Sequence, residues 1–378
     1  MIKSIGYAVK KSKNKLEPHQ FTREEPGPED VLIEVLYTGV CHSDVHQVNN
    51  DWKNTVWPCM PGHEVVGKVT RVGANVKNFK AGDTAAVGCM IESCMSCPSC
   101  IEGNEQYCES ETSWLATYNG AMMPNGQNTF GGYSNTLVVS EHFVLKVPGN
   151  LDLKSVAPIL CAGVTTYSPL KHFKVKAGQK VGVVGFGGLG HMATQIARAM
   201  GAEVTVLSTS PDKKEDALRL GASSFIHSGD KTQMEEAAES LDFILNTVPE
   251  KHEIEPYLEL LRRDAVMIIV GVLMPEPGWD PQKVIMKRRL LGGSLIGSIR
   301  ETQEVLDFCS EHGIAPQVEV IPIERINECF ENVEKKKVRY RYVIDLASLK
   351  AVEGRSDLSD LGSVGNHLKK AQAADQAA

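Results

Sequence analysis

Short apolar runs bounded by turn residues fill roughly the first 150 residues of the chain. Typical examples are VLIEVL at 31–36 and VVGKV at 65–69, with Gly, Pro or Asp close to either end. Runs of this length between turn residues are typical of β-strands. This part of the chain is therefore predicted to be β-rich.

From about residue 150 the pattern changes to apolar strand, glycine turn and helix, repeated. The strands are expected at 180–185, 203–207, 224–226, 243–246 and 266–270, and the first two helices at 188–200 and 211–220. Strands that alternate with helices of this length predict a parallel, doubly wound sheet. From about residue 299 the order becomes helix, strand, helix, strand and ends near Leu346, with a solvated turn at the lysines of 335–337.

Length and composition are those of an ordinary globular enzyme. A chain of 378 residues exceeds a typical single domain, so two domains are expected. The net charge of -7 argues against nucleic acid or an anionic membrane as the main partner. Residues 351–378 are rich in Gly, Ser, Asp and Ala and contain no aromatic residue, so we expect a disordered tail with a weak helix at 367–372.

No targeting segment is recognised. The N-terminus lacks the apolar stretch of a signal peptide, and no run approaches the roughly 18 apolar residues of a membrane span. Ten cysteines without an export signal predict a reducing, cytoplasmic location.

Four cysteines lie within a short stretch: Cys94, Cys97, Cys100 and Cys108. The two-residue gaps let a tight turn direct successive sulfurs at one centre, and a longer gap brings in the fourth. Disulfide pairing is the weaker interpretation, because neighbours only three positions apart are poorly placed to pair. Four thiolates with no vacant position predict a closed, structural zinc site.

A glycine-rich motif follows the strand expected at 180–185 and opens a helix. It consists of Gly185, Phe186, Gly187, Gly188, Leu189 and Gly190. Glycine allows a tight turn and a close approach of pyrophosphate, and the helix N-terminus offers free N–H groups to the phosphates. Alone, such a motif is often only a turn. Here the strand before it, the helix after it and the further strands predict dinucleotide binding.

The end of the next strand indicates which dinucleotide is bound. An acid there would hold the ribose 2′-OH of NAD, but this chain has Ser208, Thr209 and Ser210, followed by Lys213 and Lys214. Hydroxyl and ammonium groups suit a 2′-phosphate, and no carboxylate is expected to repel it. Alternatively, Ser210 only caps the next helix and the lysines are solvated. Because capping and phosphate binding can coexist, NADP(H) is favoured over NAD.

Metal ligands and proton carriers are dense at 39–46, where the sequence reads GVCHSDVH, and recur in PGHE at 61–64. With Cys161 far downstream, one His and two Cys from separate segments could form a three-ligand zinc site with an open position. Any single cysteine is more commonly a buried core residue. The remaining cysteines are interpreted in that way: Cys59, Cys89, Cys309 and Cys329.

These motifs together resemble zinc-dependent medium-chain dehydrogenases of the cinnamyl alcohol dehydrogenase type, a branch that includes bacterial broad-range aldehyde reductases. The matching pieces are GVCHSD at 39–44, PGHEVVG at 61–67, the four-cysteine stretch, LCAGVTTY at 160–167, GFGGLG at 185–190, and GS at 297–298 before ET at 301–302. They extend to about residue 346 and leave the tail uncovered.

The resemblance implies an α/β fold of two domains. A partly barrel-like (GroES-like) β catalytic domain would take 1–150 and 298–348 and hold two zinc ions. A doubly wound Rossmann domain would take 151–297 and bind the cofactor. Pairing of the last Rossmann strand, near 290–296, would build a homodimer.

The resemblance also implies roles in the reaction. Cys41, His63 and Cys161 would bind the catalytic zinc, with Glu64 as an alternating fourth ligand, and Asp44 would orient His63. The proton of the alcohol would pass from Ser43 through the cofactor ribose to His46, three positions later on one helix face.

The remaining roles implied by the resemblance lie along the cofactor groove. His42 would lie against the cofactor phosphates and Thr165 near the nicotinamide. Other groove residues would be Thr247, Gly271, Leu295, Ile296 and Gly297.

The function expected from these motifs is an NADP(H)-dependent, zinc-dependent alcohol dehydrogenase that acts as an aldehyde reductase. Trp52, Trp57 and Trp114 either line the substrate mouth and favour bulky, flat aldehydes, or pack in the core. An NAD-dependent polyol or secondary-alcohol dehydrogenase is the enzymatic alternative. A non-enzymatic zinc protein would lack a ligand or relay residue, and a metal-free quinone reductase would lack both zinc sites.

Overall fold

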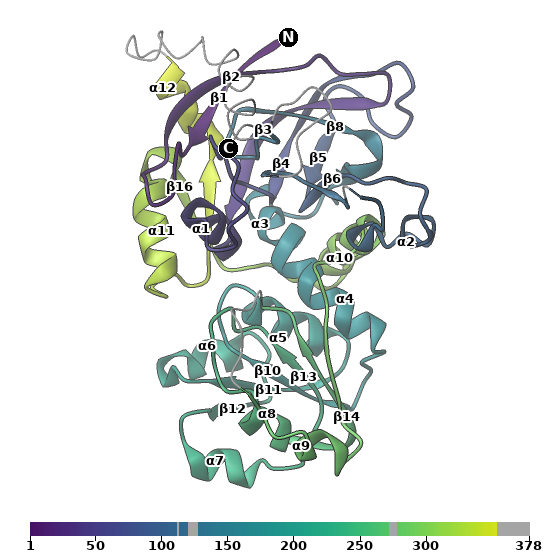
Figure 1. Ribbon diagram of the computed structural model, residues 1–378, viewed down its shortest axis with the longest axis vertical. Helices are drawn as coiled ribbons and strands as arrows, with labels where there is room; N and C mark the ends of the chain where they lie inside the picture. Colours follow the sequence, from purple (N-terminus) through teal and green to yellow (C-terminus); the bar gives the residue numbers. More distant parts are fainter. Residues whose placement is uncertain (112, 120–127, 272–277, 354–378) are drawn as a thin grey trace, which may run out of the picture.

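The mixed sheet of one lobe joins strands from both ends of the chain (Figure 1). The computed structural model describes residues 1–111, 113–119, 128–271 and 278–353. The order of this seven-stranded sheet is β16-β17-β3-β4-β5-β9, with β8 also paired to β3. Its strands are β3 (Asp30–Val40), β4 (Val65–Val72), β5 (Thr84–Val87), β8 (Thr136–Ser140), β9 (Leu145–Lys146), β16 (Val318–Pro322) and β17 (Arg341–Asp345). We call this part the mixed-sheet lobe.

Smaller elements complete the mixed-sheet lobe. Two two-stranded antiparallel sheets form from β1 (Ile2–Ala8) with β2 (Glu17–Arg23) and from β6 (Met90–Glu92) with β7 (Leu115–Ala116). The helices are α1 (His42–Asn49), α2 (Pro98–Ile101) and α11 (Ile326–Glu334). The apolar runs at 31–36 and 65–69 lie in β3 and β4, as predicted.

The second lobe is a six-stranded, entirely parallel sheet with the order β12-β11-β10-β13-β14-β15. Its strands are β10 (Lys180–Val184), β11 (Glu203–Ser208), β12 (Ser224–His227), β13 (Leu241–Asn246), β14 (Leu261–Ile269) and β15 (Leu290–Gly293). Its helices are α5 (Gly190–Ala199), α6 (Lys214–Arg219), α7 (Lys231–Glu236), α8 (Glu255–Glu259) and α9 (Gln282–Ile285). The α/β class and the parallel, doubly wound sheet of this parallel-sheet lobe are thereby confirmed.

A helical layer lies between the two sheets (Figure 1). It contains α3 (Leu153–Pro158), the π-helical turn η3 (Ile159–Gly163), α4 (Val164–His172) and α10 (Ile299–His312). The first of these helices packs on β3 and β4, whereas α4 packs on α5 of the parallel-sheet lobe. The layer is therefore shared by both lobes, and the domain limits near 150 and 298 stay a prediction.

One apolar core continues from lobe to lobe. It contains Val66 of β4, Leu160 of η3, Val183 of β10 and Val305 of α10, each essentially without solvent exposure. Burial of such side chains stabilises the fold by roughly 25 cal/mol per Å² removed from water. The two lobes and the helical layer between them therefore share one packed core.

The C-terminal residues depart in part from expectation. The predicted disordered tail at 351–378 begins inside α12 (Lys350–Glu353). The rest of that stretch, including the weak helix expected at 367–372, lies outside the described residues.

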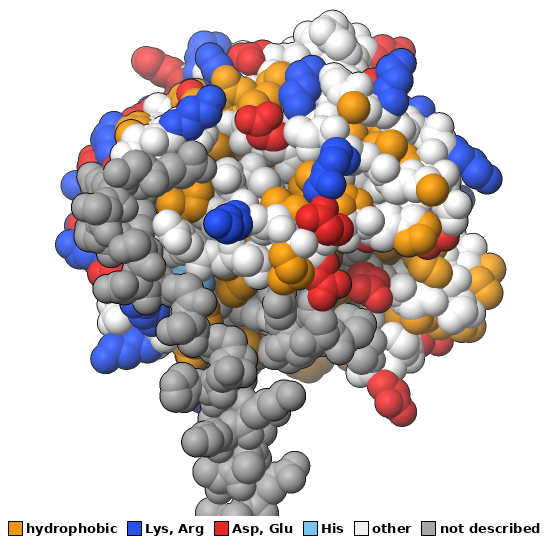
Figure 2. Space-filling view, turned by 90° about the horizontal axis from the view of Figure 1, so that it is seen from above, with side chains coloured by type: hydrophobic (Ala, Val, Ile, Leu, Met, Phe, Trp, Pro, Cys, Tyr) orange, Lys and Arg blue, Asp and Glu red, His pale blue; other side chains and the backbone are white. Residues whose placement is uncertain are grey.

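Among the described residues, no helix is long and apolar enough to cross a membrane. On the face seen in Figure 2, basic and acidic side chains are interspersed and form no large patch of one sign.

Candidate active site

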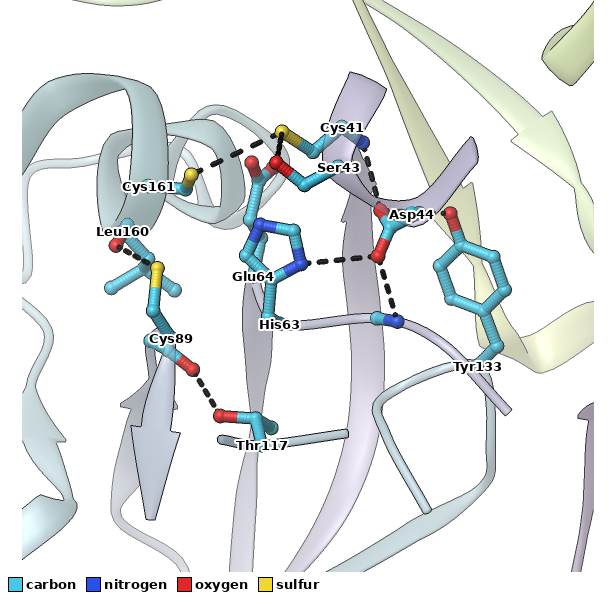
Figure 3. A network of polar contacts seen from close by, with 12 residues as sticks. Cys41, Ser43, Asp44, His63, Glu64, Cys89, Thr117, Tyr133, Leu160 and Cys161 are labelled. Atoms are coloured by element: carbon cyan, nitrogen blue, oxygen red, sulfur yellow. Dashed lines mark hydrogen bonds and ion pairs between the residues drawn. The ribbon is translucent and has the colours of Figure 1, made fainter. Parts of the chain in front are cut away.

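Four buried side chains from three separate segments converge on one point (Figure 3). The ligand atoms of Cys41, His63, Glu64 and Cys161 all lie within 4.8 Å of one another. The two sulfurs are 4.0 Å apart. Thiolates that share one tetrahedral zinc at about 2.3 Å are separated by roughly 3.8 Å. The sulfur, nitrogen and carboxylate set therefore fits the predicted zinc.

Asp44 organises this cluster from behind. Its carboxylate has no exposed surface and accepts hydrogen bonds from the backbone N–H groups of Cys41 (2.9 Å) and Gly62 (3.1 Å). Asp44 Oδ1 also lies 3.0 Å from Nδ1 of His63, and the Tyr133 hydroxyl donates to Oδ2 at 3.2 Å (Figure 3). With Nδ1 occupied, the other ring nitrogen of His63 is left for a metal.

Glu64 is paired with a residue that the sequence analysis did not single out. Arg341, the first residue of β17, forms an ion pair with Glu64 Oε1, and both side chains are almost fully buried. Burial raises the pKa of Glu64 to about 7, although the guanidinium opposes this shift. Oε2 is buried without a hydrogen-bond partner among the described residues, as expected of an atom that awaits a ligand.

No motif in the sequence identifies Arg341, because its partner Glu64 lies far away along the chain. A Cβ atom added to Gly188 would lie 3.0 Å from Cδ of Arg341. The arginine therefore connects the metal cluster with the glycine loop.

Ser43 and His46, the two residues of the predicted proton relay, face one cavity that lies between the two lobes. Ser43 and His46 both line it, and the His46 ring stacks on that of His42 with the centroids 4.7 Å apart. Nδ1 of His46 lies 2.7 Å from Oδ2 of Asp51, a partner that sequence reasoning missed. Asp51 favours the tautomer with a proton on Nδ1, which leaves Nε2 as the proton acceptor.

The second cluster gathers the four cysteines of the short stretch. The sulfurs of Cys94, Cys97, Cys100 and Cys108 lie within 4.8 Å of one another. Backbone N–H groups donate to two of them, from Cys97 to Cys94 at 3.3 Å and from Glu109 to Cys97 at 3.4 Å. Such donors stabilise thiolates, and no cysteine of the described chain forms a disulfide. The cluster fits a closed zinc site.

The other four cysteines have less polar surroundings. Cys59, Cys309 and Cys329 lie inside the apolar cores, as predicted. Cys89 is only partly buried, and its sulfur lies 3.8 Å from the carbonyl oxygen of Leu160, beside the first cluster (Figure 3).

A cavity of about 370 Å³ lies between the two lobes and reaches the metal cluster. Cys41 and Cys161 form part of its wall. The predicted cofactor residues that line it are His42, Thr165, Gly185, Phe186, Gly187, Gly188, Leu189, Ser208, Thr209, Ser210, Lys213, Thr247, Gly271 and Ile296. Residues from distant parts of the chain thus meet in one elongated site.

Three predicted cofactor residues are not part of this lining. Gly190 lies behind the loop, where an added Cβ would be 2.1 Å from the carbonyl oxygen of Gly185. Gly297 packs against Val164, and Leu295 is 40% exposed. Their predicted contact with the cofactor therefore stays a prediction.

The end of β11 differs from expectation in two ways. Ser210 precedes the 3-10 turn η4 (Pro211–Lys213), but its side chain forms no capping hydrogen bond. Acidic groups are also present near Lys213: Asp212 and Asp216 both form ion pairs with Arg339 of the mixed-sheet lobe. The expectation that no carboxylate is placed near the 2′-phosphate residues is therefore corrected.

The three tryptophans lie outside the lining of the cavity described above. Trp52 packs against His46 with the ring centroids 5.6 Å apart. Trp57 and Trp114 are partly buried against the core of the mixed-sheet lobe. Their role at a substrate mouth stays a prediction.

Comparison with known proteins gives the same picture. Residues 27–149 match the alcohol dehydrogenase GroES-like domain, and residues 188–311 match the zinc-binding dehydrogenase family. The chain is 47% identical over 350 residues to aldehyde reductase YahK of Escherichia coli, covering 92% of this chain and 99% of that one. It is 46% identical over 356 residues to mannitol dehydrogenase of Apium graveolens, covering 93% and 96%.

Among solved structures, the cinnamyl alcohol dehydrogenase (CAD) from Helicobacter pylori, complexed with NADP(H), is similar along the whole fold. The TM-score is 0.86 at 42% identity, and the match covers 92% of this chain and 99% of that one. The two matched families, these identities and the shared fold agree with the two cysteine-containing clusters. The chain therefore belongs to the zinc-dependent medium-chain alcohol dehydrogenases of the cinnamyl alcohol dehydrogenase type.

Proposed function

We propose that the protein interconverts primary alcohols and aldehydes with NADP(H), and that it works as an aldehyde reductase. One observation carries this proposal: the metal cluster and the glycine loop open onto a single cavity. A carbonyl carbon held at the cluster would therefore lie beside a nicotinamide held along the groove. Its relatives include an aldehyde reductase and CAD enzymes.

The metal cluster would hold a zinc ion, with Cys41, His63 and Cys161 as ligands. When bound, the zinc would supply the Lewis acidity that polarises the carbonyl group of the substrate. A carboxylate oxygen of Glu64 lies within 4.8 Å of the other ligand atoms, so Glu64 could take the place of a ligand that leaves the metal. Arg341 forms an ion pair with Oε1 of Glu64. Asp44 keeps the ring of His63 in place.

The chain's own residues supply the proton that reduction of a carbonyl requires. Ser43 faces the cavity at the cluster, and His46 lies one turn further along α1. We propose that Ser43 donates the proton to the substrate oxygen and is reprotonated from His46; the bound cofactor would supply the ribose hydroxyl group between the two residues. In the oxidative direction the same groups work in reverse, because acid and base exchange roles.

Selectivity for NADP(H) is assigned to the end of β11. Ser208, Thr209 and Ser210 line the cavity there, and Nζ of Lys213 donates a hydrogen bond to the carbonyl oxygen of Phe186 at 3.0 Å. Hydroxyl groups and an ammonium group suit a phosphate dianion. The CAD structure that is complexed with NADP(H) supports this assignment.

Steady-state kinetics test the proposal directly. NADPH and NADH would each be oxidised with benzaldehyde, cinnamaldehyde and a short aliphatic aldehyde, and mannitol would be offered with NADP and NAD. We expect NADPH with the aromatic aldehydes to give the highest kcat/KM. Faster turnover of mannitol, or a preference for NADH, would favour the NAD-dependent polyol dehydrogenase instead, an alternative to which the mannitol dehydrogenase among the relatives lends weight.

The assembly and the compartment are also proposed. β15 is an edge strand, and its first residue, Leu290, is 59% exposed. Ile285 and Met286, shortly before the strand, are 70% and 73% exposed. Pairing of two β15 edges would cover these side chains and give a homodimer. A reducing cytoplasm would keep both cysteine clusters available for zinc.

A further inference from the structure

A segment of the mixed-sheet lobe, residues 338–341, reaches into the parallel-sheet lobe beside the cofactor cavity. Tyr340 is 3% exposed and packs edge-on against Phe186 of the glycine loop, with the centroids 5.2 Å apart. Its hydroxyl donates to Asp216 Oδ2 at 2.7 Å, and Nζ of Lys213 lies 5.8 Å from the centre of its ring. Lys213 and Asp216 are therefore held against the same side chain.

Arg339, the neighbour of Tyr340, pairs with two acids of the parallel-sheet lobe. Nη2 contacts Asp212 Oδ2, and Nη1 lies 3.0 Å from Asp216 Oδ2. The side chains of Arg339 and Asp212 are about half exposed. Exposed ion pairs contribute little to the free energy of unfolding, so stability alone gives no reason for the pair between Arg339 and Asp212.

The acids create an electrostatic problem for a phosphorylated cofactor. Asp212 immediately precedes Lys213 in η4, and Asp216 lies one turn later in α6. Arg219 pairs with Asp216 at 2.8 Å from within α6, whereas Asp212 pairs with Arg339. Without Arg339, the carboxylate of Asp212 would lose this ion pair and stand as a negative charge beside the proposed 2′-phosphate position. Like charges repel one another, and this repulsion acts on NADPH but not on NADH, which has no 2′-phosphate. Arg339 neutralises the carboxylate of Asp212.

We propose that Arg339 determines the preference for 2′-phosphorylated dinucleotides by neutralising Asp212, the neighbour of Lys213. The inference rests on the proposed function and deepens it, because it assigns part of cofactor selectivity to the lobe that carries the metal cluster. Arg339 acts through the carboxylate of Asp212 and is a positioning residue. Selectivity then depends on the two lobes being packed together.

The test is fluorescence titration of the full-length, zinc-loaded protein with NADPH and with NADH. In Arg339→Gln we expect the Kd for NADPH to rise about tenfold, while the Kd for NADH changes less than about twofold. Adding Asp212→Asn to that variant removes the repulsion and restores the Kd for NADPH. Arg219→Gln is the matched control, because Arg219 also pairs with Asp216, at 2.8 Å, from within α6.

The outcomes are distinct. Equal weakening of NADPH and NADH in Arg339→Gln would mean that the residue only holds the lobes together, and would overturn the inference. An unchanged Kd for NADPH in Arg339→Gln, failure of the added Asp212→Asn substitution to restore it, or an equal effect of Arg219→Gln would also overturn it. A wild-type protein without preference for NADPH would instead contradict the proposed function.

Discussion

Ser43 and Asp44 are neighbours in the sequence, yet their side chains have opposite surroundings. Ser43 faces the cavity, whereas Asp44 has no exposed surface and holds the metal cluster from behind. The reason is helical geometry, since consecutive side chains on α1 point about 100° apart. Substitution of either residue should therefore affect different properties of the enzyme.

Replacing Ser43 with Ala should lower kcat by about 100-fold or more, because a positioned proton carrier contributes at least that much. The zinc content, measured by atomic absorption, should remain two per chain. Ser12→Ala is a suitable control, because Ser12 donates to the carbonyl oxygen of Asn49 at the far end of α1. Loss of zinc from the Ser43 variant would mean that the residue is structural.

His191 is a buried histidine that the proposed chemistry does not use. It has no exposed surface, its ring stacks on Tyr340, and Nδ1 lies 3.1 Å from the carbonyl oxygen of Gly187. Burial lowers its pKa to about 3, and the charge of Arg341 contributes. His191 therefore binds a proton below about pH 6.5 in the unfolded chain but stays neutral in the folded chain until the pH approaches 3. The free energy of unfolding consequently falls as the pH falls through this range.

Between pH 7 and pH 5, this linkage should lower the free energy of unfolding by about 2 kcal/mol. In His191→Asn, which retains a hydrogen-bond donor, that part of the pH dependence should be absent. Urea titrations of both proteins at the two pH values measure the difference. If the free energy of unfolding depended on pH identically in both proteins, His191 would have the same pKa in the folded and unfolded chains, contrary to this prediction.

At the scale of elements, the turn from β10 into α5 has two kinds of glycine. An added Cβ at Gly190 would lie 2.1 Å from a backbone oxygen, whereas at Gly187 it would meet no atom within 4 Å. Gly190 is therefore required by the packing of helix against turn. Gly187 lines the cavity, and the missing side chain leaves room there for the pyrophosphate of a dinucleotide.

The corresponding alanine variants should separate folding from binding. Gly190→Ala should lower the melting temperature, because a backbone atom must move. Gly187→Ala should leave it unchanged and raise the Kd for NADPH about tenfold, because its methyl group would meet the pyrophosphate. Calorimetry and NADPH titration distinguish the two. A large loss of stability in Gly187→Ala would refute this division.

At the scale of the whole molecule, the two lobes are joined in two ways. A continuous apolar core crosses the helical layer, and the segment at 338–341 inserts Tyr340 beside the glycine loop. Arg341 of that segment contacts Glu64 at the metal cluster, and Arg339 contacts α6. The cofactor groove and the metal cluster are thus built on one packed framework.

The homodimer gives a prediction at the same scale. Leu290→Lys places a charge on the exposed edge strand β15, where it should prevent edge-to-edge pairing. Light scattering coupled to size exclusion should then show a monomer, whereas we expect the wild type to elute as a dimer. Lys287→Ala, three residues earlier and before the strand, is the control. A variant that remains dimeric would place the interface elsewhere.

Much of the architecture was predictable, because each strand and each ligand motif is local in the sequence. The apolar runs marked the strands of both sheets, and the spacing of Cys94, Cys97 and Cys100 marked a metal cluster. Helix starts were less accurate: the helix expected from residue 188 begins at Gly190. The helix expected from 211 begins with a 3-10 turn.

By itself, the sequence determined what adjacent residues decide: the periodicity of strands and helices, the cysteine spacing and the glycine turn. Only the tertiary structure decided which distant charges meet. It placed Arg341 against Glu64 and Arg339 against Asp212, pairs separated by more than a hundred residues. The physical reason is that an ion pair depends on the distance between two charges in space, and chain folding alone sets that distance.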